Sequence, residues 1–197
     1  MTNSSGFVSR AGAKIEAALD AFLINPTDFI CADFGCSTGG FTECLLLHGA
    51  TKVYAVDTAY GELAWKLRTD PRVITMERTN ALNVILPELC DLIVVDTGWT
   101  RQSRILPAAL KNLKPNGTIL ALLKPHYEAE KHMLMGGKLK PEFVEQVVAK
   151  VMNEVSEIME STKSSVQTYK VMGPIESPIV GDKAKNKEFL FGINLQD

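Results

Sequence analysis

A glycine-rich turn between two apolar segments is the feature of this chain best suited to chemistry. The apolar run Phe29–Phe34 ends in the turn Gly35-Cys-Ser-Thr-Gly39-Gly40, and a second run, Lys52–Val56, ends at Asp57. Because glycines lack side chains, the backbone of this turn can approach a ligand closely. An acidic residue at the end of the next strand is placed to bind the two hydroxyls of a ribose. The pattern predicts a site for a nucleotide-type cofactor.

The spacing of the glycines distinguishes between cofactors. The dinucleotide fingerprint has the order G-x-G-x-x-G, but Ser37 occupies the second glycine position here, where the backbone would meet a pyrophosphate. Asp33 lies two residues before Gly35 and gives the looser pattern D-x-G-x-x-x-G-G, which is typical of methyltransferases. Its carboxylate is expected to orient loop N–H groups or to meet the cofactor's amino group. Asp57 follows Gly35 by 22 residues, enough for one helix and one strand.

Strands and helices alternate along the rest of the chain. The predicted strands are Phe29–Phe34, Lys52–Val56, Arg72–Met76, Asp91–Val95, Thr118–Leu123, Val166–Val171 and Glu188–Ile193. The predicted helices are Arg10–Leu23, Gly40–His48, Gly61–Arg68, Ile105–Leu113 and Pro141–Ser161, with Pro115-Asn116-Gly117 as a turn.

This alternation predicts an α/β fold with a parallel sheet covered by helices on both faces. The last two strands have no helix between them, so we expect them to form an antiparallel hairpin at one edge. Seven strands ending in such a hairpin are the usual plan of the Rossmann-like class I methyltransferases, which use S-adenosylmethionine. A dinucleotide-binding fold would more often continue the alternation.

Composition predicts a single domain over residues 1–197, with residues 1–24 as an N-terminal helical segment. The chain has 197 residues, of which 46% are hydrophobic, an ordinary value for a globular protein. No apolar run is long enough to cross a bilayer, and the N-terminus lacks a signal peptide's apolar region, so we expect a cytoplasmic protein without a membrane partner. Four cysteines form no CxxC pair and are expected to be buried apolar residues rather than metal ligands: Cys31, Cys36, Cys44 and Cys90.

Charge restricts how the chain could bind nucleic acid. The formal net charge is −2 and the pI is about 6.0, so an RNA-binding role would require a local basic patch. Two segments could supply one, Lys131–Lys140, which contains Gly136-Gly137, and Lys183–Lys187. The alternative interpretation of both is a solvated loop.

Three tracts of the chain resemble the TlyA-type (hemolysin A) family of ribosomal RNA 2′-O-methyltransferases, within the FtsJ-like group. These tracts are Ser9–Lys14, Asp33–Arg68 and Arg72–Asn80. The resemblance extends over nearly the whole chain. It implies S-adenosylmethionine as the cofactor and RNA, as ribosomal RNA or a ribosomal subunit, as the partner, with no DNA partner.

The resemblance also implies a Lys-Asp-Lys-Glu tetrad, matched here by Lys14, Asp96, Lys124 and Glu188. Such a tetrad suits methyl transfer to a ribose 2′-hydroxyl. Lys124 is expected to act as general base or to orient the hydroxyl, with Asp96 orienting it. Burial and the like charge of Lys14 would lower the pKa of Lys124, whereas Asp96 and Glu188 would raise it.

The expected cofactor-binding residues combine the glycine-rich turn with the ends of neighbouring strands. Asp57 is expected to hold the ribose diol, Asn80 to lie where such enzymes contact the adenine edge, and Asp96 to face the methionyl end. The full set is Asp33, Gly35, Ser37, Gly39, Gly40, Phe41, Asp57, Asn80 and Asp96. Phe41 and Tyr60 are expected either to pack near the cofactor or to belong to the core, and Trp65 to pack.

Two departures from the family keep other functions open. Only eight residues precede Ser9, so we expect the family's N-terminal S4 RNA-binding domain to be missing. The segment Thr97–Ser103 after Asp96 is also atypical; its Trp99 would either stack on a target base or cap the core. The alternatives are therefore a methyltransferase acting on a small molecule and a non-catalytic cofactor- or RNA-binding module. Oligomeric state is not specified by the sequence.

Overall fold

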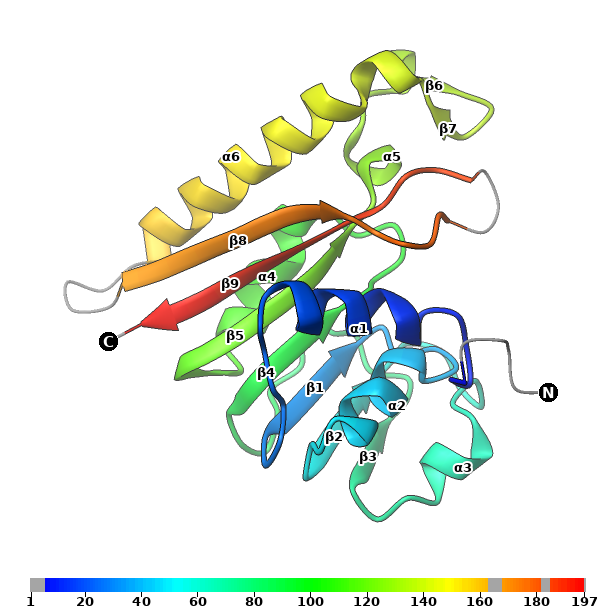
Figure 1. The fold of residues 1–197 in the computed structure, drawn as a ribbon, viewed down its shortest axis with the longest axis vertical. Coiled ribbons are helices and arrows are strands. Elements are labelled where there is room, and N and C mark those ends of the chain that lie inside the picture. The colour runs from blue at the N-terminus through cyan, green and yellow to red at the C-terminus, as the bar shows by residue number, and fades with distance from the viewer. Residues whose placement is uncertain (1–5, 163–167, 182–184, 197) are drawn as a thin grey trace.

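A seven-stranded sheet forms the centre of the protein, as the computed structural model in Figure 1 shows. The structure describes residues 6–162, 168–181 and 185–196. The strand order is β3-β2-β1-β4-β5-β9-β8. The strands are β1 (Ile30–Phe34), β2 (Lys52–Val56), β3 (Val73–Met76), β4 (Cys90–Val95), β5 (Leu113–Leu123), β8 (Thr168–Glu176) and β9 (Phe189–Gln196).

Strands β1 to β5 are parallel, whereas β9 runs antiparallel to both of its neighbours, β5 and β8. The expected class I methyltransferase plan, with its antiparallel terminal hairpin, is thus confirmed. The chain reverses direction across the sheet between β1 and β4. At such a switch point the loops diverge and leave a crevice at the carboxyl ends of the strands, where open α/β sheets bind ligands.

Helices cover the sheet on both faces (Figure 1). They are α1 (Gly12–Ala21), α2 (Gly40–Leu47), α3 (Trp65–Arg68), α4 (Gln102–Leu110), α5 (Pro125–Glu128) and α6 (Val144–Thr162), with short 3-10 turns at Lys131–Met133 and Pro141–Phe143. None of the helices in the described ranges is both long and apolar enough to cross a membrane.

Each central strand contributes to two separate cores. In β4, Ile93 and Val95 pack into the core beneath α4 and α6, whereas Leu92 and Val94 pack into the core beneath α1 and α2. Successive side chains of a strand point to opposite faces, so a strand buried on both sides must be apolar throughout. This explains why DLIVV has no polar alternation. All four cysteines are buried within these cores and are free, as expected.

Several predicted boundaries were wrong. The turn Pro115–Gly117 lies inside β5, where the pairing with β4 shifts register between Cys90 and Leu92. The helix expected over Gly61–Arg68 begins only at Trp65, because Gly61 has a φ of +79° and Ala64, directly before the helix, has an extended ψ of 137°. Part of the strand predicted at Val166–Val171 lies outside the described residues.

The short elements between β5 and α6 were not predicted, namely α5, the 3-10 turn at Lys131–Met133 and a hairpin. Strands β6 (Leu134–Met135) and β7 (Lys138–Leu139) form a separate two-stranded hairpin around Gly136-Gly137. We predicted Lys131–Lys140 as a basic patch or, alternatively, a solvated loop, without strands. Two-residue strands are too short to produce a periodic pattern, which is why the hairpin was missed.

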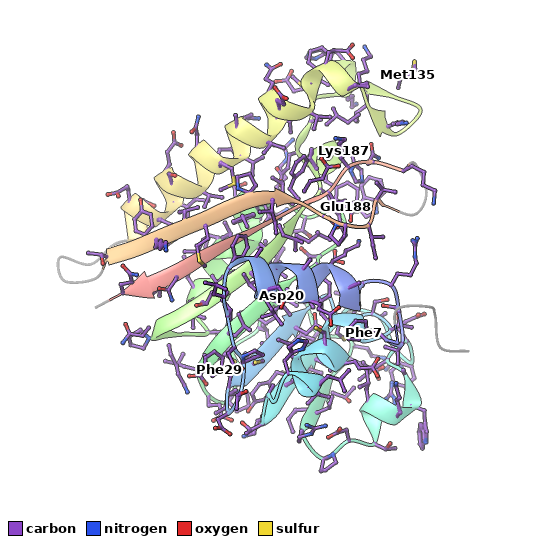
Figure 2. All side chains as sticks on the ribbon, in the orientation of Figure 1. Phe7, Asp20, Phe29, Met135, Lys187 and Glu188 are labelled. Carbon is purple, nitrogen blue, oxygen red and sulfur yellow. The ribbon has the colours of Figure 1, made fainter. Side chains whose placement is uncertain are left out.

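Helices α1 and α2 cross closely near the N-terminus. Phe7, labelled in Figure 2, is buried against Gly12, where an added Cβ would lie 2.4 Å from the Phe7 ring. The Val8 N–H donates to the buried Glu43 carboxylate of α2 over 2.5 Å. These contacts fix the start of α1 against α2.

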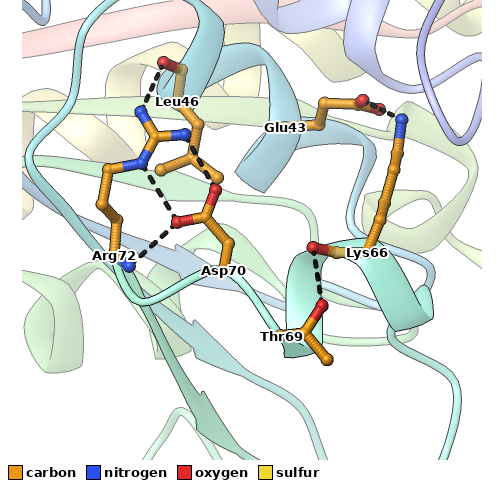
Figure 3. Close-up of polar contacts among 6 residues, drawn as sticks. All are labelled: Glu43, Leu46, Lys66, Thr69, Asp70 and Arg72. Atoms are coloured by element: carbon orange, nitrogen blue, oxygen red, sulfur yellow. Dashed lines mark hydrogen bonds and ion pairs between the residues drawn. The ribbon is translucent and has the colours of Figure 1, made fainter.

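Polar contacts hold α3 and the following turn against α2 (Figure 3). Lys66 forms an ion pair with Glu43, and the Arg72 guanidinium donates to the Leu46 carbonyl over 3.3 Å. Asp70 accepts from the Arg72 guanidinium over 2.8 Å, which holds that group in place. Because α3 has a single turn, its position depends on these partners rather than on its own helical stability.

Gly40→Ala should destabilise the protein. Its Cβ would lie 2.3 Å from Ser9 Oγ and 2.9 Å from the Gly12 nitrogen, so α1 would have to move. We expect the free energy of unfolding to fall by about 1–3 kcal/mol, the usual effect of overpacking. Urea denaturation measures this. In the control Gly98→Ala the new methyl group meets no atom within 4 Å, and its midpoint should match wild type. Equal midpoints for both variants would contradict the close crossing.

Candidate active site

Two adjoining cavities lie at the carboxyl ends of the parallel strands. The larger has a volume of about 690 Å³ and the smaller about 220 Å³. Gly35, Ser37 and Asp96 line both. The crevice expected at the β1–β4 switch point is therefore present as a two-part site, with Asp96 at the junction.

The glycine-rich turn is shaped by close packing against β2 and β4. Gly35 has a φ of +90°, and a Cβ there would lie 2.4 Å from the Asp96 carbonyl oxygen. Gly39 has a φ of +97° and caps α2; its Cβ would lie 2.3 Å from Leu67 of α3. Gly35 thus lets the turn reach the end of β4, while Gly39 faces α3 and lines neither cavity.

Asp33 supplies a fully buried carboxylate to the larger cavity. Its Oδ2 accepts from the Thr42 backbone N–H over 2.9 Å and from the Thr42 hydroxyl over 2.7 Å. Its Oδ1 is buried and has no hydrogen-bond partner among the described residues. Burial raises the pKa of Asp33 to about 7, against the lowering effect of the Thr42 hydroxyl, and the charge of Asp96 adds to the rise. An unsatisfied carboxylate oxygen here suits a cationic ligand group.

Asp57 connects the glycine-rich turn with the loop after β2. Its Oδ2 accepts from the Ser37 N–H and its Oδ1 from the Ala59 N–H, both over 2.8 Å. Each oxygen keeps a second lone pair, so the carboxylate can still accept bonds from a ligand. Asp57 and Asn80 line the smaller cavity together. The side-chain oxygen of Asn80 accepts from the Leu82 N–H over 3.0 Å, so its amide group is left to donate.

The four tetrad positions meet in the larger cavity as two ion pairs. Lys14 Nζ lies 2.6 Å from Glu188 Oε2, and Lys124 Nζ is paired with Asp96 Oδ1. All four side chains are less than one-fifth exposed. They come from α1, from the position directly before β9 and from the positions directly after β4 and β5, so only the folded chain brings them together.

The environment of Lys124 favours its ammonium form. Burial lowers the pKa of Lys124, but the ion pair with Asp96 and the charge of Glu188 outweigh it, so the pKa is raised overall. The sequence alone did not decide whether the pKa of Lys124 is raised or lowered, since the charge of Lys14 was expected to lower it. In the structure the charge of Lys14 is compensated by Glu188 at 2.6 Å.

An aromatic wall borders the larger cavity. Trp99, with 86% of its surface exposed, stacks on Tyr127 with ring centroids 4.6 Å apart and an interplanar angle of 28°. Lys124 Nζ lies 5.6 Å from the Tyr127 centroid. Trp99 was predicted either to stack on a target base or to cap the core, and its exposure excludes the second role.

Most of the predicted residues lie in the two cavities. The larger is lined by Lys14, Asp33, Gly35, Ser37, Gly40, Phe41, Asp96, Lys124 and Glu188. Tyr60 lies outside both: it is exposed and stacks with Arg78, whose guanidinium carbon is 4.4 Å from the ring centroid. Trp65, expected to pack, is also exposed.

Sequence reasoning missed several lining residues of the larger cavity. They are Ser9, Arg10, His126, Tyr127, Ile179, Gly181 and Asn186. His126 and Tyr127 follow Lys124 directly, so their place next to a tetrad residue was the available signal. Ile179 and Asn186 had none, because only tertiary structure brings the β8–β9 connection to the cavity.

Comparison with known proteins shows which protein family has this architecture. A model of the FtsJ-like methyltransferase domain matches residues 7–195. Hemolysin A of Brachyspira hyodysenteriae is 36% identical over 189 residues, which cover 93% of this chain and 75% of that protein. TlyA of Mycobacterium tuberculosis, named a 16S/23S rRNA (cytidine-2′-O)-methyltransferase, is 44% identical over 129 residues, 64% of this chain and 48% of that protein.

Solved structures also superpose on this chain. A Streptococcus thermophilus protein named as a candidate hemolysin superposes with a TM-score of 0.86 at 35% identity, over 97% of this chain and 68% of that one. The N-methyltransferase NodS of Bradyrhizobium japonicum superposes with a TM-score of 0.60 at 16% identity, over 95% of this chain and 99% of that one, a likeness of fold alone. The domain match and the relatives lead to one conclusion: this chain belongs to the FtsJ-like methyltransferase family.

Proposed function

We propose that this protein transfers a methyl group from S-adenosylmethionine to a ribose 2′-hydroxyl of ribosomal RNA. The observation that carries the proposal is the Lys124–Asp96 pair, because Asp96 lies where the two cavities join. A donor could extend from the smaller cavity into the larger one, where an acceptor would meet Lys124. The name of the Mycobacterium tuberculosis relative supports rRNA as the acceptor. A 2′-hydroxyl acceptor also specifies RNA over DNA, which lacks this group.

The residues of the two cavities fit this cofactor. Asp57 and Asn80 would hold its nucleoside, since a carboxylate with free lone pairs suits a diol and an amide donor suits a ring nitrogen. Asp33 Oδ1, buried without a partner among the described residues, suits the ammonium of its amino-acid end. When bound, S-adenosylmethionine supplies a methyl group already activated on a sulfonium.

The chain's own work is to orient the acceptor and to take its proton. Lys124, held by Asp96, is placed to bind the 2′-hydroxyl, and its neutral form can accept the proton as the oxygen reacts. Lys14 and Glu188 would place the ribose. The exposed face of Trp99 suits stacking of an unpaired base at the cavity mouth.

Lys124→Ala should abolish most methyl transfer. Loss of a general base typically costs 10²–10⁴-fold in rate. We expect at least a 100-fold decrease in tritiated methyl incorporation from S-adenosylmethionine into ribosomal subunits or deproteinised rRNA. The matched control is Lys114→Ala, which removes a lysine held 2.8 Å from Asp91 but lining neither cavity, and should stay within about twofold of wild type. Labelling of a small metabolite instead of RNA would refute the proposed substrate.

The rate of methyl transfer should rise with pH. Burial lowers the pKa of Lys124, but Asp96 and Glu188 raise it overall, so its neutral form is scarce at pH 7 and increases about tenfold per pH unit below that pKa. Single-turnover rates between pH 7 and 9 should therefore give a logarithmic slope near one. Lys124→Arg, which stays charged, should be slow with a flat profile. A flat wild-type profile would show that Lys124 only orients the hydroxyl.

Asp57→Asn should weaken cofactor binding. The amide keeps one acceptor oxygen, which cannot serve both the loop N–H groups and a ribose diol. Losing one or two charge-assisted hydrogen bonds costs about 1.5–3 kcal/mol, or roughly 10- to 100-fold in the Kd of S-adenosylhomocysteine, measured by calorimetry. The control Asp28→Asn changes an exposed turn aspartate that lines neither cavity. Unchanged affinity for Asp57→Asn would remove it from the cofactor site.

A further inference from the structure

Two neighbouring chain segments contribute to the lining of the larger cavity. One is the β6–β7 hairpin, which contributes Gly136 and Gly137; the other is the connection between β8 and β9, which contributes Gly181 and Asn186. Figure 1 shows the hairpin near the part of this connection that directly precedes β9, residues 185–188. Neither segment belongs to the class I sheet and helices that hold the two cavities.

A single side chain joins these segments. Asn186 is 5% exposed, and its Oδ1 accepts from the Leu139 N–H over 2.9 Å. Its Nδ2 donates to the Gly137 carbonyl over 3.2 Å, and its own carbonyl accepts from the Gly181 N–H over 3.0 Å. The side-chain amide of Asn186 thus bonds both the base and the tip of the hairpin.

The hairpin has few other means of holding its tip in place. Its strands pair over two residues each, and such a short ribbon is marginal by itself. Buried Leu139 and Met133 anchor its base, and the Lys140 N–H donates to the Met133 carbonyl over 3.0 Å. A Cβ at Gly136 or Gly137 would meet no atom within 4 Å, so packing does not restrain the tip.

Both segments carry exposed cations. Lys138 lies on the hairpin, Lys131 in the 3-10 turn directly before it, and Lys185 on the connection. No carboxylate within the described ranges forms an ion pair with these three lysines. The neighbouring acids are partly engaged, since Glu176 pairs with Lys187 at 2.9 Å and Glu130 lies 3.4 Å from His132. Lys131, Lys138 and Lys185 form what we call the basic rim.

Asn186 is also close in sequence to the tetrad. Glu188, labelled with Lys187 in Figure 2, follows two residues later and holds Lys14. A bond that fixes Asn186 against the hairpin therefore also fixes the basic rim relative to the tetrad.

We propose that Asn186 is a positioning residue that joins the hairpin and the β8–β9 connection into one RNA-binding rim. The rim holds the phosphate backbone of the acceptor strand, so that its ribose reaches Lys124. This rests on the proposed function for the identity of the ligand as RNA. Asn186 itself touches no reacting group.

Asn186→Ala should raise the KM for deproteinised rRNA at least tenfold and lower kcat less than threefold. The Kd of S-adenosylhomocysteine should not change, because Asn186 lines only the larger cavity and its side-chain amide is bonded to the hairpin, whereas Asp57 and Asn80 line the smaller cavity. The matched control is Asn153→Ala, an exposed asparagine on α6 that lines neither cavity; it should match wild type. An unchanged KM in a folded Asn186→Ala protein overturns the inference.

Hydrogen exchange tests directly whether Asn186 holds the hairpin. The Leu139 amide should exchange at least tenfold faster in Asn186→Ala than in wild type, because its acceptor is gone. Lys138→Ala should weaken rRNA binding in wild type and have a smaller effect in the Asn186→Ala background, since a released hairpin no longer places Lys138 on the strand. Additive effects, or unchanged exchange at Leu139, overturn the inference.

Two further outcomes are distinguishable. If wild type binds rRNA without methylating it, while Asn186→Ala weakens that binding, the proposed function fails and the inference stands.

A second variant covers the case in which Asn186→Ala is destabilised. If Asn186→Ala lowers the melting temperature by more than about 5 °C, the KM is measured on Asn186→Asp instead. That variant keeps the acceptor for the Leu139 N–H and loses the donor to Gly137, and its KM should rise about threefold; no rise overturns the inference.

Discussion

The site depends on the neutralisation of buried carboxylates by lysines from distant parts of the chain. Glu188 is 3% exposed, and an unpaired charge at such a position would be strongly unfavourable. Lys14, 174 residues away in sequence, compensates it at 2.6 Å. Removing one member of a buried pair leaves the other uncompensated, so the N-terminal helix and the last strand are bound to each other by charge as well as by packing. The Lys124–Asp96 pair does the same for β5 and β4.

These pairs require the surrounding backbone to be positioned closely. Asp96 can lie against the glycine-rich turn only because Gly35 lacks a side chain, and α1 can bring Lys14 inward only because Gly12 and Gly40 allow it to pack on Phe7 and α2. The two cores on either face of β4 hold this arrangement rigidly. The glycines therefore serve the ion pairs as much as any ligand.

Much of the fold could be predicted from the sequence, because its strands are apolar and its longer helices have regular spacing. The β6–β7 hairpin could not be, since two-residue strands leave no pattern. The tetrad was found only through family resemblance: Lys14 and Lys124 lie in ordinary local contexts, and nothing but the fold distinguishes them from surface lysines. Asn186 was missed because its partners, Gly137 and Leu139, are nearly fifty residues away.

The charges of the tetrad balance one another, so the tetrad itself adds little to the affinity for a polyanion. Its two lysines and two carboxylates form two pairs, so the cluster as a whole offers little net attraction to a polyanion. In a chain of net charge −2, attraction of a phosphate backbone must then come from exposed cations outside the cluster. In our proposal the basic rim meets this requirement, because its lysines lie on or next to the segments that contribute Gly136, Gly137 and Asn186 to the larger cavity. Under this proposal the two interior pairs would serve the reaction, and the lysines of the rim would serve recognition of the strand.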